Sequence, residues 1–122
     1  MDVQPYWNED HTKYAVLVAR GYGAGFSTWS DYSEIAYDGR VVEWFLEHDM
    51  AYMQRLHGLH ENEEQREALQ FFKAIGYDQY ICFLGLDSCE IEWVPAGTCW
   101  RMTEYDGAEG IEYQNKQDWV CF

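Results

Sequence analysis

Two runs of alternating residues lie within Ser88–Gly110, and they constrain the fold more than any other part of the chain. In the first run Glu90 and Glu92 alternate with residues of lower polarity. Because the side chains of a strand point alternately to opposite faces, this run predicts a strand with one buried face and one acidic, solvated face. A Pro-Ala-Gly turn separates it from the second run, and Asp106-Gly107 predicts the turn after that. The stretch therefore predicts a β-meander.

Carboxylates are concentrated in this predicted meander. We expect six of them to lie along its solvent-facing side and to contact a partner: Glu90, Glu92, Glu104, Asp106, Glu109 and Glu112. Only Arg101 and Lys116 offset them locally. A second acidic group lies on the predicted helices, at Glu43, Glu47, Asp49, Glu61, Glu63, Glu64 and Glu67. Carboxylates on a rigid surface can take the positions of nucleic-acid phosphates in a cationic groove, and charge steers such a protein to its partner.

The other segments complete an α+β pattern. A continuous apolar run, Lys13–Ala19, predicts a strand that is buried on both faces. Apolar residues at helical spacing predict one long helix over Arg40–Leu56 and a second over Glu63–Ile75. A further apolar strand is predicted over Tyr77–Leu84. Short strands after the meander are predicted at Gly110–Gln114 and Asp118–Phe122, with a turn at Asn115-Lys116 between them.

These segments describe a single α+β domain over residues 1–122, a length that suits one core. The expected order is β-α-α-β-β-β-β, with two helices on one face of a mostly antiparallel sheet of about five strands. The predicted core consists of Val16, Val18, Phe45, Leu46, Leu69, Phe72, Ile81, Phe83, Ile91, Trp93, Trp100 and Val120.

Three glycines in Gly21–Gly25 follow the first predicted strand. A phosphate site would need backbone N–H groups at the start of a helix, and neither Gly-Lys-Ser/Thr nor a complete G-x-G-x-x-G is present. We expect the glycines to form a turn that lets Phe26 and Trp29 pack against the sheet. His57 and His60 form an H-x-x-H pair, but a metal site needs further ligands held rigidly, so we expect no metal or other cofactor.

The four cysteines, Cys82, Cys89, Cys99 and Cys121, fall in predicted strands and form no C-x-x-C pair. The first residues lack the pattern of a signal peptide, and no apolar run reaches membrane-spanning length. We therefore expect a cytoplasmic protein with reduced thiols and no disulfide. None of these cysteines lies near a histidine in the sequence, and the carboxylates of the meander lack an apolar pocket, so we expect no enzymatic activity.

The net charge is −14, from 22 acidic and 8 basic side chains. Such a chain lacks the cationic groups that displace counterions from nucleic acid, which excludes a simple nucleic-acid binder. The charge instead favours either solubility or a basic protein partner.

Three segments resemble small acidic proteins encoded by phages and prophages: GYGAGFSTW (Gly21–Trp29), GRVVEWFLE (Gly39–Glu47) and IEWVPAGTCWRMTEYDGAEGIE (Ile91–Glu112). The resemblance covers most of the chain, and its last segment is the most specific. It implies a phage context but no activity or site residues, since that group has no assigned activity. By analogy, small acidic phage proteins often inhibit host defence enzymes that handle nucleic acid, such as CRISPR effectors or restriction systems.

The leading functional hypothesis is therefore a non-enzymatic acidic inhibitor of a basic, nucleic-acid-handling host protein, as in an anti-CRISPR that acts by nucleic-acid mimicry. Three alternatives remain at this point. The first is an immunity protein that binds a basic toxin nuclease. The second is an accessory phage protein whose charge only confers solubility. The third is a small enzyme or ligand binder that uses the Gly21–Trp29 loop and the histidines.

Overall fold

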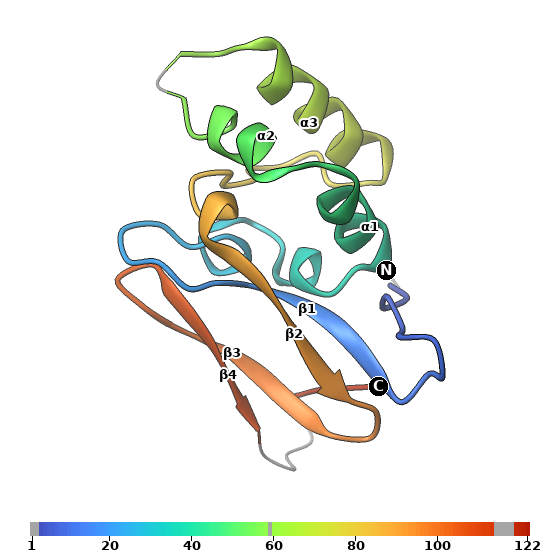
Figure 1. The fold of residues 1–122 in the computed structure, drawn as a ribbon. Helices are drawn as coiled ribbons and strands as arrows, with labels where there is room; N and C mark the ends of the chain where they lie inside the picture. Colours follow the sequence, from blue (N-terminus) through green and yellow to red (C-terminus); the bar gives the residue numbers. More distant parts are fainter. Residues whose placement is uncertain (1–2, 59, 114–118) are drawn as a thin grey trace.

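The central strand of the molecule is β1 (Lys13–Ala19), and it is covered on both faces. In the computed structural model, which describes residues 3–58, 60–113 and 119–122, β1 pairs antiparallel with β2 (Cys89–Pro95) from Lys13↔Pro95 to Ala19↔Cys89. The helices lie on one side of this pair and a second sheet lies on the other (Figure 1). Two layers of β-structure and one layer of helices therefore make up the fold.

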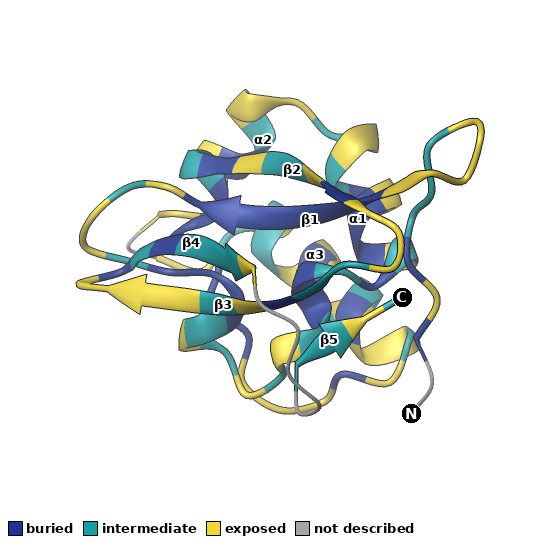
Figure 2. Ribbon diagram, turned by 90° about the horizontal axis from the view of Figure 1, so that it is seen from below, coloured by how far each residue is buried: buried dark blue, intermediate teal, exposed yellow. Residues whose placement is uncertain are grey.

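Alternate side chains of β1 enter two different cores, which confirms the prediction of a strand that is buried on both faces. Ala15, Leu17 and Ala19 face the helices and join the larger core. The other set, Tyr14, Val16 and Val18, packs with Val94 and Trp100 against the second sheet. Seen from the side of that sheet, β1 is buried from Tyr14 to Ala19 whereas β3 is largely exposed (Figure 2).

The second sheet has the strand order β4-β3-β5, with antiparallel pairing throughout. Its strands are β3 (Cys99–Tyr105), β4 (Ala108–Tyr113) and β5 (Val120–Cys121). The predicted turn at Asp106-Gly107 joins β3 to β4, and both residues have positive φ angles, 53° and 87°, as a two-residue hairpin of type I′ requires. Gln114, Asn115, Lys116 and Asp118, which belong to the predicted last strands and turn, lie outside the described residues.

The α+β class is confirmed, but the strands form two sheets rather than one. β2 and β3 follow each other around the Pro-Ala-Gly turn, yet β2 pairs with β1 and β3 pairs with β4 and β5. The reason is that β1 is apolar on both faces, so a single sheet with helices on one side would leave Val16 and Val18 in water. Crossing to a second layer after Pro95 covers them.

The helical layer contains three α-helices: α1 (Gly39–Glu47), α2 (Met50–Arg55) and α3 (Glu63–Ala74). The prediction of α3 is confirmed to within one residue, and Asn62 and Gln65 begin it with a reciprocal capping box.

The predicted helix over Arg40–Leu56 is wrong as a single element. His48 and Asp49 have extended backbones, and the Asp49 carboxylate caps α2 by accepting from the Tyr52 N–H at 2.9 Å. Short 3₁₀ helices are η1 (Ser27–Trp29), η2 (Ser33–Ala36) and η3 (Leu86–Ser88).

The predicted strand at Tyr77–Leu84 is also wrong. The segment is irregular, and its apolar residues fill the larger core from a loop. Its backbone is bound by local partners instead of a strand ladder: the Cys82 N–H donates to the Ser30 hydroxyl at 2.8 Å, and the Tyr80 N–H donates to the Asp31 carboxylate at 3.0 Å. A short apolar run between turns is equally compatible with a buried loop when its hydrogen bonds are satisfied in this way.

The predicted core is partly confirmed. Six of its members are buried: Val16, Val18, Phe72, Ile81, Phe83 and Trp100. Four others are half-buried against the cores: Phe45, Leu69, Ile91 and Val120. Leu46 and Trp93 were placed wrongly, since they are 49% and 40% exposed. Trp93 instead contacts the ring of Tyr6 at the edge of the middle layer.

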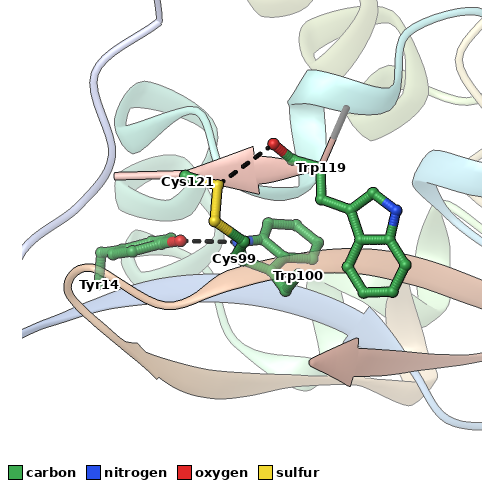
Figure 3. The surroundings of a disulfide bond; sticks show 5 residues. All are labelled: Tyr14, Cys99, Trp100, Trp119 and Cys121. Atoms are coloured by element: carbon green, nitrogen blue, oxygen red, sulfur yellow. Dashed lines mark hydrogen bonds between the residues drawn. A yellow bond between two sulfur atoms is a disulfide. The ribbon is translucent and has the colours of Figure 1, made fainter. Parts of the chain in front are cut away.

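A disulfide joins Cys99 to Cys121, which contradicts the expectation of reduced thiols. The two residues face each other across the β3–β5 pair with their Cα atoms 4.4 Å apart, within the range that a disulfide spans. The bond lies beside the buried indole of Trp100, whose N–H donates to the Tyr14 hydroxyl at 2.7 Å (Figure 3). Cys82 and Cys89 are free and buried. The expected redox compartment does not predict such a bond, because the bond depends on the register in which β3 and β5 pair.

Candidate interaction surfaces

Glu109, expected at the partner-binding face, is buried and only 4% exposed. Its carboxylate accepts hydrogen bonds from the backbone N–H groups of Ala19, Phe26 and Thr28 at 2.8–3.0 Å and from the Thr28 hydroxyl at 2.6 Å. Converging N–H groups of this kind form an anion-binding nest. The nest beside the glycine loop is therefore occupied by the chain's own carboxylate, and Glu109 does not lie on the solvent-facing side where it was expected.

Glu92 lies between the two sheets rather than on an open face. It accepts a hydrogen bond from the Arg20 guanidinium at 2.6 Å and another from the Tyr113 hydroxyl. Burial and this bond to the carboxylate raise the pKa of Tyr113 above its ordinary value. The neighbouring Glu90 has a side chain that is 70% exposed and lies 3.6 Å from Arg20. Of the first two predicted contacts, only Glu90 remains accessible.

The remaining three carboxylates of the meander also have local roles. Glu112 is bound by Arg101, whose Nε and Nη2 both donate to Oε2 at 3.0–3.1 Å. Glu104 accepts from the Gly107 N–H at 2.8 Å and so supports the hairpin turn. Asp106 is exposed at that turn, and its backbone carbonyl accepts from the Gly23 N–H. The structure thus does not bring the six predicted residues together on one solvated face.

Most of the exposed carboxylates that have no bonding partner within the described residues are instead on or beside the helices. Five exposed carboxylates on or beside the helices have no hydrogen bond or ion pair within the described part of the chain: Glu43, Glu47, Glu61, Glu63 and Glu67. Four arginines are already engaged by carboxylates elsewhere: Arg20, Arg40, Arg55 and Arg101. Arg66 and Lys73 also lie on α3, and no ion pair joins them to these five residues. The helical layer is therefore a net acidic surface.

A hollow of about 250 Å³ opens on this surface between α1 and α3, and we call it the α1–α3 hollow. Its lining residues are Arg40, Glu43, Trp44, Glu47, Phe71 and Ile75. The rings of Trp44 and Phe71 stack with centroids 5.6 Å apart and planes 11° apart. An aromatic floor and two carboxylates at the rim give this hollow a chemistry suited to cations.

Two other hollows are less charged. One of about 370 Å³ lies between the glycine loop and η3 and contains the His57–Asp87 pair, with Nδ1 and Oδ2 3.3 Å apart. Another, of about 270 Å³, lies beside Trp100 and Trp119 and is mainly apolar.

Of the two aromatic residues expected to pack against the sheet after the glycine loop, Phe26 is buried as predicted, whereas Trp29 is partly exposed. Among the described residues, no three His, Cys, Asp or Glu side chains converge as a metal site would require.

Comparison with models of known protein families, with curated proteins and with solved structures finds no match to this chain. Within the described ranges, no helix has the length and apolar character needed to cross a bilayer. The function therefore has to be inferred from the chain's own surfaces.

The sequence did contain a signal for the helical surface. Glu43 and Glu47 are one helical turn apart, a spacing that places them on the same side of α1. That pattern alone is typical of an ordinary solvated helix face. What distinguishes it is the aromatic hollow beside it, which depends on the packing of α3 against α1 and has no signature in the sequence of α1.

Proposed function

We propose that this protein is a non-enzymatic inhibitor that binds a basic, nucleic-acid-handling protein through the carboxylates of its helical layer. The observation that carries the proposal is the distribution of charge. Five carboxylates on or beside the helices are exposed and have no bonding partner among the described residues, whereas the carboxylates of the meander are largely bound within the chain. This distribution supports a partner surface on the helices rather than on the meander.

The negative charge of this surface indicates the class of protein that it binds. A net charge of −14 repels nucleic acid and attracts cationic clefts, and complementary charge accelerates association at low salt. A cleft that normally holds nucleic acid is lined by Lys and Arg side chains that contact phosphates. A chain that occupies such a cleft competes directly with nucleic acid.

The resemblance to small acidic phage proteins gives the proposal its biological setting. In that setting the first partners to test are bacterial defence nucleases, including CRISPR effectors and restriction enzymes. The protein would act there as a competitor that needs no cofactor and no catalytic residue.

The test compares two triple variants that each remove three negative charges. One variant neutralises the helical layer (Glu43→Gln, Glu47→Gln, Glu67→Gln), and its matched control neutralises the exposed meander residues (Glu90→Gln, Glu104→Gln, Asp106→Asn). Immobilised protein is incubated with bacterial lysate at low salt, and a captured basic protein is purified. Its association with each variant and its binding to labelled DNA and RNA are then measured.

We expect the unmodified chain to displace nucleic acid from the captured protein and to be released at high salt, where the Debye length falls to about 3 Å. The helical variant should associate at least about tenfold more slowly, and the meander variant should behave like the unmodified chain. The proposal fails if no basic nucleic-acid-binding protein is captured, or if the two variants associate equally well.

A further inference from the structure

We propose that the α1–α3 hollow is the anchor site for an arginine side chain of the basic partner. This inference rests on the proposed function and deepens it, since it names the chemical group that the acidic layer recognises. Figure 1 shows α1 next to β1 and α3 farther from the sheets, and the two rim residues of the hollow, Glu43 and Glu47, are exposed. The site is therefore on a face that a partner can approach.

The rim of the hollow supplies two carboxylates at a spacing that suits a guanidinium group. Glu43 and Glu47 are four residues apart on α1, so their Cβ atoms are about 5–6 Å apart. Both are exposed, and neither has a cationic partner within the described residues. Like charges at this spacing repel each other, and a cation placed between them replaces that repulsion with two attractions.

The floor of the hollow is apolar and aromatic. Trp44 is only 5% exposed, and its indole is fixed by stacking on Phe71 and by edge contact with Phe72 at 5.3 Å. Ile75 completes the apolar lining. A long cationic side chain buries its methylene stem on such a surface while its charged end remains at the rim. Because the floor is already packed, little ordering is needed when a ligand enters.

Arg40 lines one end of the hollow, but its charge is committed to Asp38. Its Nε and Nη2 donate to the Asp38 carboxylate at 3.1 and 2.7 Å, and its backbone N–H donates to the same group at 3.0 Å. The Tyr77 hydroxyl holds that carboxylate from the other side at 2.6 Å. Arg40 is thus fixed next to the N-terminus of α1 and leaves the rim carboxylates for an external cation.

Arginine fits this arrangement better than lysine. The planar guanidinium has five N–H donors in a rigid fork, so it can bind both Glu43 and Glu47 at the rim. The ammonium of lysine is a strongly hydrated point charge and lacks the planar face. The hollow should therefore discriminate between two side chains of equal charge.

The experiment is a titration of ¹⁵N-labelled protein with the acetylated and amidated tripeptide Gly-Arg-Gly, followed by ¹H–¹⁵N correlation spectra. Matched peptides replace arginine by lysine, which keeps the charge, or by citrulline, which keeps the shape without the charge. With the arginine peptide we expect the amide signals of Glu43, Glu47, Phe71 and Ile75 to shift most. The lysine peptide should bind several-fold more weakly, and the citrulline peptide should produce no saturable shift.

Two double variants locate the site. In Glu43→Gln/Glu47→Gln the affinity for the arginine peptide should fall about tenfold. In Glu90→Gln/Asp106→Asn the same number of charges is removed from exposed residues of β2 and of the β3–β4 turn, which do not line the hollow, and the affinity should remain unchanged. Dispersed spectra of both variants show that they fold. Equal losses in the two variants, equal binding of the citrulline or lysine peptide, or shifts confined to other residues would overturn the anchor site.

The outcome is separable from that of the proposed function. If the tripeptide does not bind at the hollow but the helical triple variant still loses the captured partner, the inhibitor function stands and the anchor site is wrong. If the tripeptide binds as expected but no basic protein is captured, the anchor chemistry stands and the inhibitor function is wrong.

Discussion

Asp38 is a buried carboxylate that organises the start of the helical layer. It accepts hydrogen bonds from the backbone and guanidinium of Arg40 and from the hydroxyl of Tyr77. Burial by itself disfavours the charged form, but the hydrogen bonds from Arg40 and Tyr77 outweigh it and hold the pKa of Asp38 below its ordinary value. In return, burial and the bond to this carboxylate raise the pKa of Tyr77. The charge of Asp38 therefore contributes to folding.

Replacement of Asp38 by Asn should lower the free energy of unfolding by about 1–2 kcal/mol at neutral pH, because Asn keeps the helix cap but not the charge. The contribution of a carboxylate with a lowered pKa is complete above its unfolded value of about 3.9 and is lost as the pH falls through the folded value. Urea unfolding of both proteins should therefore show a constant difference from about pH 8 to about pH 5 and a progressively smaller one below. A difference that persists undiminished at about pH 2 would show that the charge is not its source.

Glu109 shows what residue patterns alone cannot reveal. In the sequence it lies three residues before Glu112 in a predicted strand, so alternation places the two carboxylates on opposite faces, with Glu109 on the face of Ile111. In the structure Glu109 faces the N–H groups of the glycine loop, whereas Glu112 faces Arg101. The local alternation separates the two faces of β4, but the groups that Glu109 binds belong to a loop more than 80 positions away, and the local sequence does not identify them.

At the scale of elements, β5 is the shortest strand and depends on a covalent bond. It contains only Val120 and Cys121, and its pairing with β3 includes the two bonded cysteines. Its neighbour Phe122 contacts the rings of Tyr14 and Tyr37 at the smaller core. The bond thus holds the end of the chain against Trp100 and its surroundings.

Replacement of both cysteines, Cys99→Ser/Cys121→Ser, should lower the free energy of unfolding by about 3 kcal/mol, the effect expected for closing a loop of this size. Urea unfolding followed by tryptophan fluorescence measures the change, and dithiothreitol should destabilise the unmodified protein to the same level while leaving the variant unaffected. Binding of the arginine peptide should be unchanged, because the disulfide joins two strands of the second sheet whereas the α1–α3 hollow is lined by the helical layer, and these two layers lie on opposite sides of the β1–β2 pair (Figure 1). Equal urea midpoints for the variant and the oxidised protein would contradict this role.

Element prediction succeeded where the pattern was long and the caps were clear, as for β1 and α3. It failed at His48-Asp49, because the apolar stripe continues across a break that is decided by the Asp49 cap. It failed again at Tyr77–Leu84, where side chains of a neighbouring loop supply the hydrogen bonds that a sheet would have supplied. Both errors arise from contacts that compete with local periodicity.

At the scale of the whole molecule, the charge of −14 opposes folding through self-repulsion. Sodium chloride should therefore raise the melting temperature by a few degrees between about 0.01 M and about 1 M, as the Debye length falls from about 30 Å to about 3 Å. The rise should be smaller in the helical triple variant, which carries three fewer negative charges. Differential scanning calorimetry checks both expectations, and a melting temperature that falls or stays constant with salt would contradict them.

The α+β class and the acidic character were predictable from the sequence because both follow from composition and periodicity. The division into two sheets was not, although its cause was present in the doubly apolar β1. The position of the candidate site was not predictable either. Whether a glutamate is exposed and unpaired depends on which arginine, loop or neighbouring strand reaches it, as Glu92 and Glu43 illustrate in opposite ways.

The placement of β1 also affects how the chain is made. β1 is complete once Ala19 has been synthesised, but β2, its partner strand, ends only at Pro95. At roughly 5–20 residues per second, the ribosome leaves this apolar segment without its partner for several seconds. Short, uncharged segments of high β-propensity associate with one another when they are uncovered. Fragments that end before Pro95 should therefore aggregate, and the nascent chain should require chaperones until its middle layer is complete.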